Sequence, residues 1–233
     1  MSELIPPKRA SRASPRGSRR PRGGPSAANL IDTLRRTILL GACALFALPA
    51  LAQEAPDALV KRVSQEVLQV IKTDPKVQAG DQARIREVIE TKLVQHFDFL
   101  RMTSLAMGRN WAKATPEQQK RLADEFKSLL VRTYSNALIQ YRNQEIDYKA
   151  LRADPNATEV NVRTEVIRPG QSAVPIDYAM TKGPSGWKAY DVVVGGVSLV
   201  TNYRDEFNEQ IRQGGVDGLI NSLAARNKGG GAK

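Results

Sequence analysis

The stretch WKAYDVVVGGVSLVTNYRDEF, residues 187–207, decides the fold class. It combines an apolar strand led by Trp187, a Gly195-Gly196 turn, a second apolar step and the start of a charged helix. A strand that is apolar on both faces needs cover on both faces. The segment therefore predicts a sheet that is covered by helices or by something that the protein binds.

Three segments before this stretch alternate apolar and polar residues with a period of two, which is typical of strands with one buried face. They span residues 145–150, 159–166 and 174–181, and turn-forming residues such as Pro169-Gly170 separate them. Because these connections are short, they favour an antiparallel meander of four strands that ends with residues 187–194.

Helical patterns flank the meander. Residues 56–71 and 82–93 each carry an apolar stripe, and Asp81 is the expected N-cap of the second helix. Residues 97–111 predict a short helix and a loop. Thr115-Pro116-Glu117-Gln118 is a capping box that begins a long helix reaching about Tyr141. After the sheet, Gly214-Gly215 divides two last helices. This order predicts an α+β fold, with a four-stranded antiparallel sheet packed against helices.

Residues 1–52 have the composition of a basic leader followed by a signal peptide. Residues 1–36 hold nine Lys or Arg and two acidic residues, so they supply +7 of the formal net charge of +11. Arg35-Arg36, an apolar run over 38–48 and Ala50-Leu51-Ala52 match a signal peptide cut after Ala52. The run is shorter than the roughly 20 residues that cross a bilayer. We expect the exported chain to begin at Gln53 and to be soluble.

Few residues offer catalytic or metal-binding chemistry. His96 is the single histidine, and Cys43, the single cysteine, lies in the predicted signal peptide. Asp191 is the carboxylate to consider as an acid or base, with structural pairing to an Arg or a backbone amide as its alternative. Acidic and basic residues mix on the polar strand positions, which disfavours nucleic-acid binding. We therefore expect no enzyme, no cofactor, no metal site and no nucleic-acid partner.

Apolar side chains of the sheet and of the long helix either close into a core or leave a pocket for a hydrocarbon chain, and composition alone leaves both possibilities open. The candidate lining residues are Phe97, Leu130, Tyr134, Leu138, Tyr141, Val160, Val162, Val166, Ile176, Tyr178, Met180, Val192, Val194 and Val197. Candidate basic residues at the rim of such a pocket are Arg142, Lys149, Arg163, Lys188 and Arg204, with a solvated surface charge as the alternative for each.

Several stretches match one family in order. YDVVVGGVSLVTNYRDEF (190–207) and GGVDGLI (214–220) closely resemble the C-terminal signature of the MlaC family of periplasmic phospholipid-binding proteins, also called toluene-tolerance auxiliary proteins. The resemblance continues upstream through FDFLRMTSLAMGRNW (97–111) and TPEQQKRLADEF (115–126), so it covers residues 53–227.

The resemblance implies a fold like that of nuclear transport factor 2 with an added helical part. Residues 53–227 would form a phospholipid-binding domain, with helices in 53–114 and the long helix, sheet and last helices in 115–227; residues 228–233 would be a flexible tail.

The resemblance also implies a monomeric periplasmic carrier with phospholipid as its cargo. Its partners would be an outer-membrane MlaA-like lipoprotein with a porin and an inner-membrane ABC transporter complex with an MCE domain. Such a shuttle would maintain outer-membrane lipid asymmetry. The alternative is a periplasmic chaperone or structural protein with a filled core.

Overall fold

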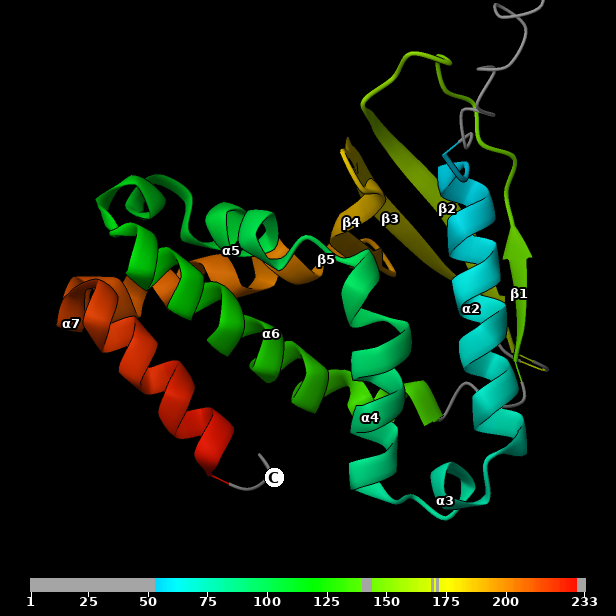
Figure 1. Ribbon diagram of the computed structural model, residues 1–233, viewed down its shortest axis with the longest axis horizontal. Coiled ribbons are helices and arrows are strands. Elements are labelled where there is room, and N and C mark those ends of the chain that lie inside the picture. The colour runs from blue at the N-terminus through cyan, green and yellow to red at the C-terminus, as the bar shows by residue number, and fades with distance from the viewer. Residues whose placement is uncertain (1–52, 140–143, 169, 171, 230–233) are drawn as a thin grey trace, which may run out of the picture. The chain divides into compact units, whose positions relative to one another are not determined.

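The computed structural model describes residues 53–139, 144–168, 170 and 172–229 (Figure 1). The chain divides into two units, Met1–Ala52 and Gln53–Lys233, and every described residue belongs to the second. The predicted leader and signal peptide therefore lie outside the described residues, as do Tyr141 and Arg142. Within these ranges, no helix combines the length and the apolar character that a membrane span requires.

The sheet is an antiparallel meander in which each strand pairs with the next one in sequence. Its strands are β1 (Glu145–Tyr148), β2 (Glu159–Ile167), β3 (Val174–Gly183), β4 (Gly186–Val194) and β5 (Val197–Ser198). The four predicted strands and the α+β class are confirmed. The fifth strand has only two residues, which is too short for a periodic pattern to reveal.

The helices precede and follow the sheet, as the sequence predicts. They are α2 (Pro56–Thr73), α3 (Pro75–Gln78), α4 (Gln82–Lys92), α5 (Phe99–Met107), α6 (Pro116–Ile139) and α7 (Leu199–Lys228), with 3₁₀ turns η1 (Val94–His96) and η2 (Gly108–Lys113). Asp81 caps α4 by accepting from the N–H groups of Ala83 and Arg84. The short helix α3, which follows Asp74, is not apparent from the sequence.

Two predicted helix boundaries are confirmed by their hydrogen bonds and backbone angles. At the start of α6, the N–H of Thr115 donates to Gln118 Oε1 (2.9 Å), and the N–H of Gln118 donates to Thr115 Oγ1 (3.3 Å). These are the two reciprocal bonds of a capping box. In α7, Gly215 has a φ of 67° and interrupts the helical backbone. That φ is accessible to glycine at little cost, so the chain turns there between the two predicted helices.

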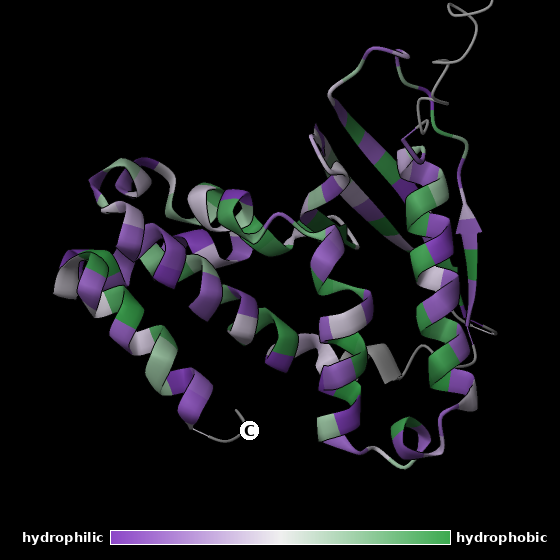
Figure 2. Ribbon diagram, in the orientation of Figure 1, coloured by the Kyte–Doolittle hydropathy of each residue, from purple (hydrophilic) through white to green (hydrophobic). Residues whose placement is uncertain are grey.

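The described residues form three hydrophobic clusters in the interior of this unit. In the first, α5, α6 and α7 meet around Phe126, whose ring packs edge-on against Tyr203 and Phe207 with centroids 5.1 Å from each. In the second, the first half of α2 packs on the sheet. In the third, the second half of α2 packs against α4 and Val131 of α6. Figure 2 shows apolar and polar residues alternating along α2 and α4, as expected of helices with one buried side.

The α5 segment is attached to the sheet at specific points. The N–H of Asp98 donates to the carbonyl of Ala189 in β4 (2.8 Å). Arg101 pairs with Glu159 of β2 (2.6 Å), and its guanidinium lies 3.8 Å from the ring centroid of Tyr190 in β4. Helix α6, by contrast, packs mainly against α4, α5 and α7 rather than against strands. Part of the sheet is therefore left without direct cover from the long helix.

The hairpin after β4 is held to the start of α7 by Asp191. Gly195 and Gly196 both have positive φ (59° and 86°), which is the requirement of a two-residue type I′ turn. Asp191 accepts from the N–H groups of Val192 (2.8 Å) and Val200 (3.2 Å) and from Ser198 Oγ (2.5 Å). Of the two roles open to Asp191, the structure shows the structural one, with backbone amides as its partners.

We expect Asp191→Ala to destabilise the fold by about 2–3 kcal/mol, because hydrogen bonds to a charged group contribute about 1.5–3 kcal/mol each and their donors lose this acceptor. Urea denaturation measures the change. Asp205→Ala, which removes an exposed carboxylate from α7, is the matched control. Equal stability of the two variants would show that the Asp191 bonds do not hold the hairpin to α7.

Candidate functional site

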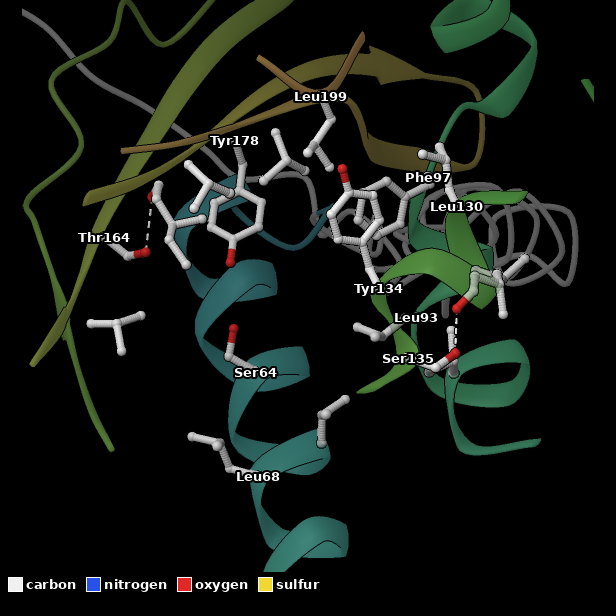
Figure 3. A pocket seen from close by; sticks show the side chains of 18 of the residues that line it. Ser64, Leu68, Leu93, Phe97, Leu130, Tyr134, Ser135, Thr164, Tyr178 and Leu199 are labelled. Carbon is white, nitrogen blue, oxygen red and sulfur yellow. Dashed lines mark hydrogen bonds between the residues drawn. The ribbon is translucent and has the colours of Figure 1, made fainter. Parts of the chain in front are cut away.

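An apolar cavity of about 280 Å³ lies between the sheet, α2, α4, α5 and the C-terminal half of α6 (Figure 3). None of the described residues that line it is charged. The lining residues are Ser64, Val67, Leu68, Ile71, Ile89, Leu93, Val94, Phe97, Phe99, Met102, Leu130, Val131, Tyr134, Ser135, Ile146, Thr164, Val166, Ile176, Tyr178, Val192, Val194 and Leu199. This composition suits a hydrocarbon group better than a polar ligand.

Several hydroxyl groups on the cavity wall are bonded to neighbouring protein groups. Thr164 Oγ1 donates to the carbonyl of Ile176 in the adjacent strand (2.9 Å), and Ser135 Oγ donates to the carbonyl of Val131 one turn earlier in α6. Ser64 hydrogen-bonds with the phenol of Tyr148. These polar groups already have hydrogen-bond partners within the protein. An apolar ligand that covers them therefore leaves none of them buried without a partner.

Two tyrosines reach into the cavity from opposite layers. In Figure 3, Tyr178 extends from the sheet with its hydroxyl directed toward α2, and Tyr134 extends from α6 toward Leu199. Burial raises the pKa of Tyr134 to about 12, with a smaller contribution from its hydrogen bond to Tyr203. The shift agrees with the partial burial of Tyr134 against the helical core.

The structure brings eight of the predicted lining residues together on the cavity wall. They are Phe97, Leu130, Tyr134, Val166, Ile176, Tyr178, Val192 and Val194. Phe97 is fixed there because it bridges to Ala189 at the edge of β4. The side chain of Leu138 and the whole of Tyr141 fall outside the part of the chain that the structure describes.

Four predicted lining residues are not on the cavity wall. Val160, Val162 and Met180 lie at the end of the sheet where the first half of α2 packs directly on it, with Leu59, Val60 and Val63. They belong to a filled core, and Val162 and Met180 are each only 2% exposed. Val197 is 58% exposed because it follows the glycine turn, and Leu199 lines the cavity instead.

The second half of α2, together with α4, forms a wall that the sequence did not assign to the site. Val67 and Ile71 come from α2, and Ile89 comes from α4. All three occupy apolar stripes at helical spacing, so their burial is apparent from the sequence. The periodic pattern does not indicate whether a stripe faces another side chain or an empty space, because both require the same apolar residues.

The polar candidates do not converge on the cavity. Lys149 forms ion pairs with Asp147 (2.7 Å) and Glu165 (2.8 Å), and Arg204 donates to the carbonyl of Leu105. The pKa of His96 is lowered, first by burial and then by the charge of Arg62. Neither His96 nor Asp191 lines the cavity. Among the described residues, no group of three His, Cys, Asp or Glu side chains is placed to hold a metal ion.

Comparison with known proteins gives the family. The family model described as "MlaC protein" matches residues 61–225. The chain belongs to the MlaC family. The match begins within α2 and ends near the end of α7, so the described residues that line the cavity, Ser64 to Leu199, all fall inside the family region.

Individual relatives are also similar to this chain over most of its length. The toluene tolerance protein ttg2D of Pseudomonas putida is 27% identical over 81% of this chain and 87% of its own. The intermembrane phospholipid transport system binding protein MlaC of Haemophilus influenzae is 23% identical over 75% of this chain and 83% of its own. The solved structure of a phospholipid-binding protein from Ralstonia solanacearum, in complex with a phospholipid, is 42% identical. Its TM-score is 0.70, and the match covers 75% of this chain and 97% of that one. The names of these relatives describe binding, transport or solvent tolerance, and none describes an enzyme.

We expect Tyr134→Phe to remove one phenol that ionises near pH 12 rather than near its ordinary pKa of about 10. The folded pKa is raised, so the stability from burying the neutral phenol is complete below about pH 10 and is lost as the pH rises through about 12. Ultraviolet absorbance of tyrosinate, followed during alkaline titration of both proteins, measures the difference. Loss of a phenol titrating near pH 10 would show that Tyr134 is open to water.

Proposed function

We propose that this chain binds a phospholipid by its acyl chains in the apolar cavity. The observation that carries the proposal is an apolar cavity with no charged residue among its described lining residues, placed between the sheet and four helices of an MlaC-family fold. The Ralstonia solanacearum relative, 42% identical and solved in complex with a phospholipid, supports the same cargo. The cavity favours a carrier over the alternative of a chaperone or structural protein with a filled core.

The size of the cavity implies that loading widens it. A cavity of about 150 Å³ holds a benzene molecule, so a cavity of about 280 Å³ holds roughly one short alkyl segment. Two full acyl chains need more room than that. The space can grow where α6 faces the sheet, because α6 packs mainly on other helices.

The energetics of such cargo require a transfer partner. Two acyl chains bury about 28 methylenes, and at about 0.8 kcal/mol each the gross gain is on the order of 20 kcal/mol. This value reaches the practical ceiling of non-covalent affinity before ordering costs are subtracted. Dissociation of the phospholipid into water is then too slow to support transport. Unloading therefore needs a partner that opens the cavity or offers an equally apolar path.

We further propose that the chain acts in the periplasm as a monomeric shuttle. It would exchange phospholipid with an outer-membrane MlaA-like lipoprotein and porin, and with an inner-membrane ABC transporter complex that has an MCE domain. The export signal expected before Gln53 and the family membership support this assignment. The proposed role is to maintain the lipid asymmetry of the outer membrane.

Solvent extraction of the purified protein, followed by mass spectrometry, tests the cargo. We expect phospholipid in stoichiometric amount, with its tails protected from water by the cavity. A protein that is folded by circular dichroism and yields no lipid, and that takes none up from phospholipid vesicles, would contradict the proposal.

A matched pair of substitutions tests the place where the cargo binds. Ile176 in β3 lines the cavity, whereas Ile167 in β2 is 41% exposed and is not among the lining residues. We expect Ile176→Trp to lower lipid occupancy severalfold, because the indole occupies space that the acyl chains need. Ile167→Trp should retain lipid at the level of the unmodified protein.

The melting temperature separates loss of cargo from loss of fold. We expect lipid-free Ile176→Trp to melt within about 4 °C of the lipid-free unmodified protein, which corresponds to a stability change of at most about 1–2 kcal/mol for a chain of this size. The indole enters existing space and therefore does not overpack the core. Equal lipid loss in both variants, or full occupancy in Ile176→Trp, would place the cargo elsewhere.

A further inference from the structure

A second hollow lies between α5, η2 and α7, and its chemistry is opposite to that of the apolar cavity. Its volume is about 1010 Å³, and it is lined by Ser104, Leu105, Gly108, Arg109, Asn110, Lys113, Arg204, Asn208 and Arg212. Among the described residues that line this hollow, four are cationic and none is acidic. None of the described lining residues belongs to both hollows. We call this second hollow the basic cleft.

The cations come from two segments that are distant in sequence. Arg109 and Lys113 belong to η2, while Arg204 and Arg212 lie eight residues apart on α7, with Asn208 midway between them. Helices α5 and α7 pack side by side and bring these segments together (Figure 1). Residues at spacings of four share one side of a helix, so α7 presents a row of Arg204, Asn208 and Arg212 to the cleft.

Most of this positive charge is not neutralised within the protein. Arg212 pairs with Glu209, but Arg109 forms no ion pair within the described part of the chain. Arg204 donates Nε and one Nη to the carbonyl of Leu105 (3.3 and 3.2 Å), which is neutral. Three of its five N–H donors are left over from these two bonds. Cations concentrated in a concave site focus the electric field and attract acidic groups.

The floor of the basic cleft is organised before any ligand arrives. Asn110 Nδ2 donates to Asn208 Oδ1 (2.8 Å), which links η2 to α7 across the cleft. Lys113 Nζ donates to Asn110 Oδ1 (2.8 Å), which holds the ammonium on the η2 side. A site with fixed walls loses less conformational entropy on binding than a mobile surface does.

We propose that the basic cleft docks an extended acidic segment of a partner protein. Eight residues of helix rise about 12 Å, so Arg204 and Arg212 lie too far apart along α7 to converge on one phosphate. About four residues of extended chain cover the same 12 Å, which matches a peptide with carboxylates at alternate positions. A flat anionic membrane would touch the rim of a concave site and leave the charges on its walls uncontacted.

This inference goes beyond the proposed lipid cargo and does not depend on it. Because the two hollows share no lining residue, a partner segment held in the basic cleft leaves the apolar cavity free to load and unload. A carrier would then be retained beside a partner during transfer. Electrostatic docking of this kind mainly speeds association and weakens as salt rises.

Binding of a short fluorescein-labelled peptide of alternating Glu and Ser, followed by fluorescence anisotropy at low salt, tests the proposal. The double variant Arg109→Glu with Arg212→Glu should bind the peptide at least about tenfold more weakly than the unmodified protein, since it places like charges opposite the carboxylates. The control double variant is Arg86→Glu with Lys72→Glu. It makes the same charge change at exposed positions of α4 and α2 and should differ from the unmodified protein by less than about threefold, the effect of net charge alone.

Further measurements distinguish binding of an acidic peptide from binding of a small anion or of an anionic membrane. The same peptide with Gln in place of Glu should not bind. Equal weakening by both double variants, or no binding of the acidic peptide, would overturn the proposal. Complete competition by millimolar inorganic phosphate at constant ionic strength would assign the cleft to a small anion instead. Cleft-dependent binding to vesicles containing phosphatidylglycerol, without peptide binding, would assign it to a membrane. Lipid extracted from the cleft variant should be unchanged, so failure of this docking proposal stays distinct from failure of the cargo proposal.

Discussion

The structure depends on how the sheet is held to the helices. The first half of α2 packs directly on one end of the sheet, and the α5 segment is attached through Asp98 and Arg101. The long helix α6 is supported by other helices instead. Apolar side chains of β2, β3 and β4 beyond these attachments face the helices across a space that no described side chain fills. The cavity is a consequence of where the layers touch.

Helix α6 serves two purposes along its length. Its first half is locked into the helical core, where Phe126 is completely buried against Tyr203 and Phe207. Farther along, Leu130 and Tyr134 form part of the cavity wall. A firmly packed first half holds the second half in place without requiring contact with the sheet. This part of α6 is therefore positioned by the helical core, while its lack of support from the sheet leaves room for the cavity to widen around the proposed acyl chains.

The two hollows separate two kinds of recognition. The apolar cavity gains affinity from burying methylenes, a non-directional interaction that tolerates different chains. The basic cleft offers four cations, of which Lys113 is held by Asn110. Such charges would select a partner by the pattern of its carboxylates. A carrier has to hold its cargo tightly but bind its partners only briefly. A single surface would have to meet both demands at once. Placing the two functions on different residues satisfies both demands.

The sequence by itself determined the main helices and the first four strands, their order and the family, but not the short elements α3 and β5. Period-two and helical patterns, the Thr115 capping box and the glycines at 195–196 and 214–215 are local signals, so they are readable before any packing is known. The same signals identified eight of the residues on the cavity wall. Only the tertiary structure separated these from Val160, Val162 and Met180, and only it added α2 and α4 to the wall. The physical reason is that the sequence pattern around an apolar residue is the same whether its side chain packs against a neighbour or faces a cavity. The distance between the sheet and the helices decides which of the two occurs.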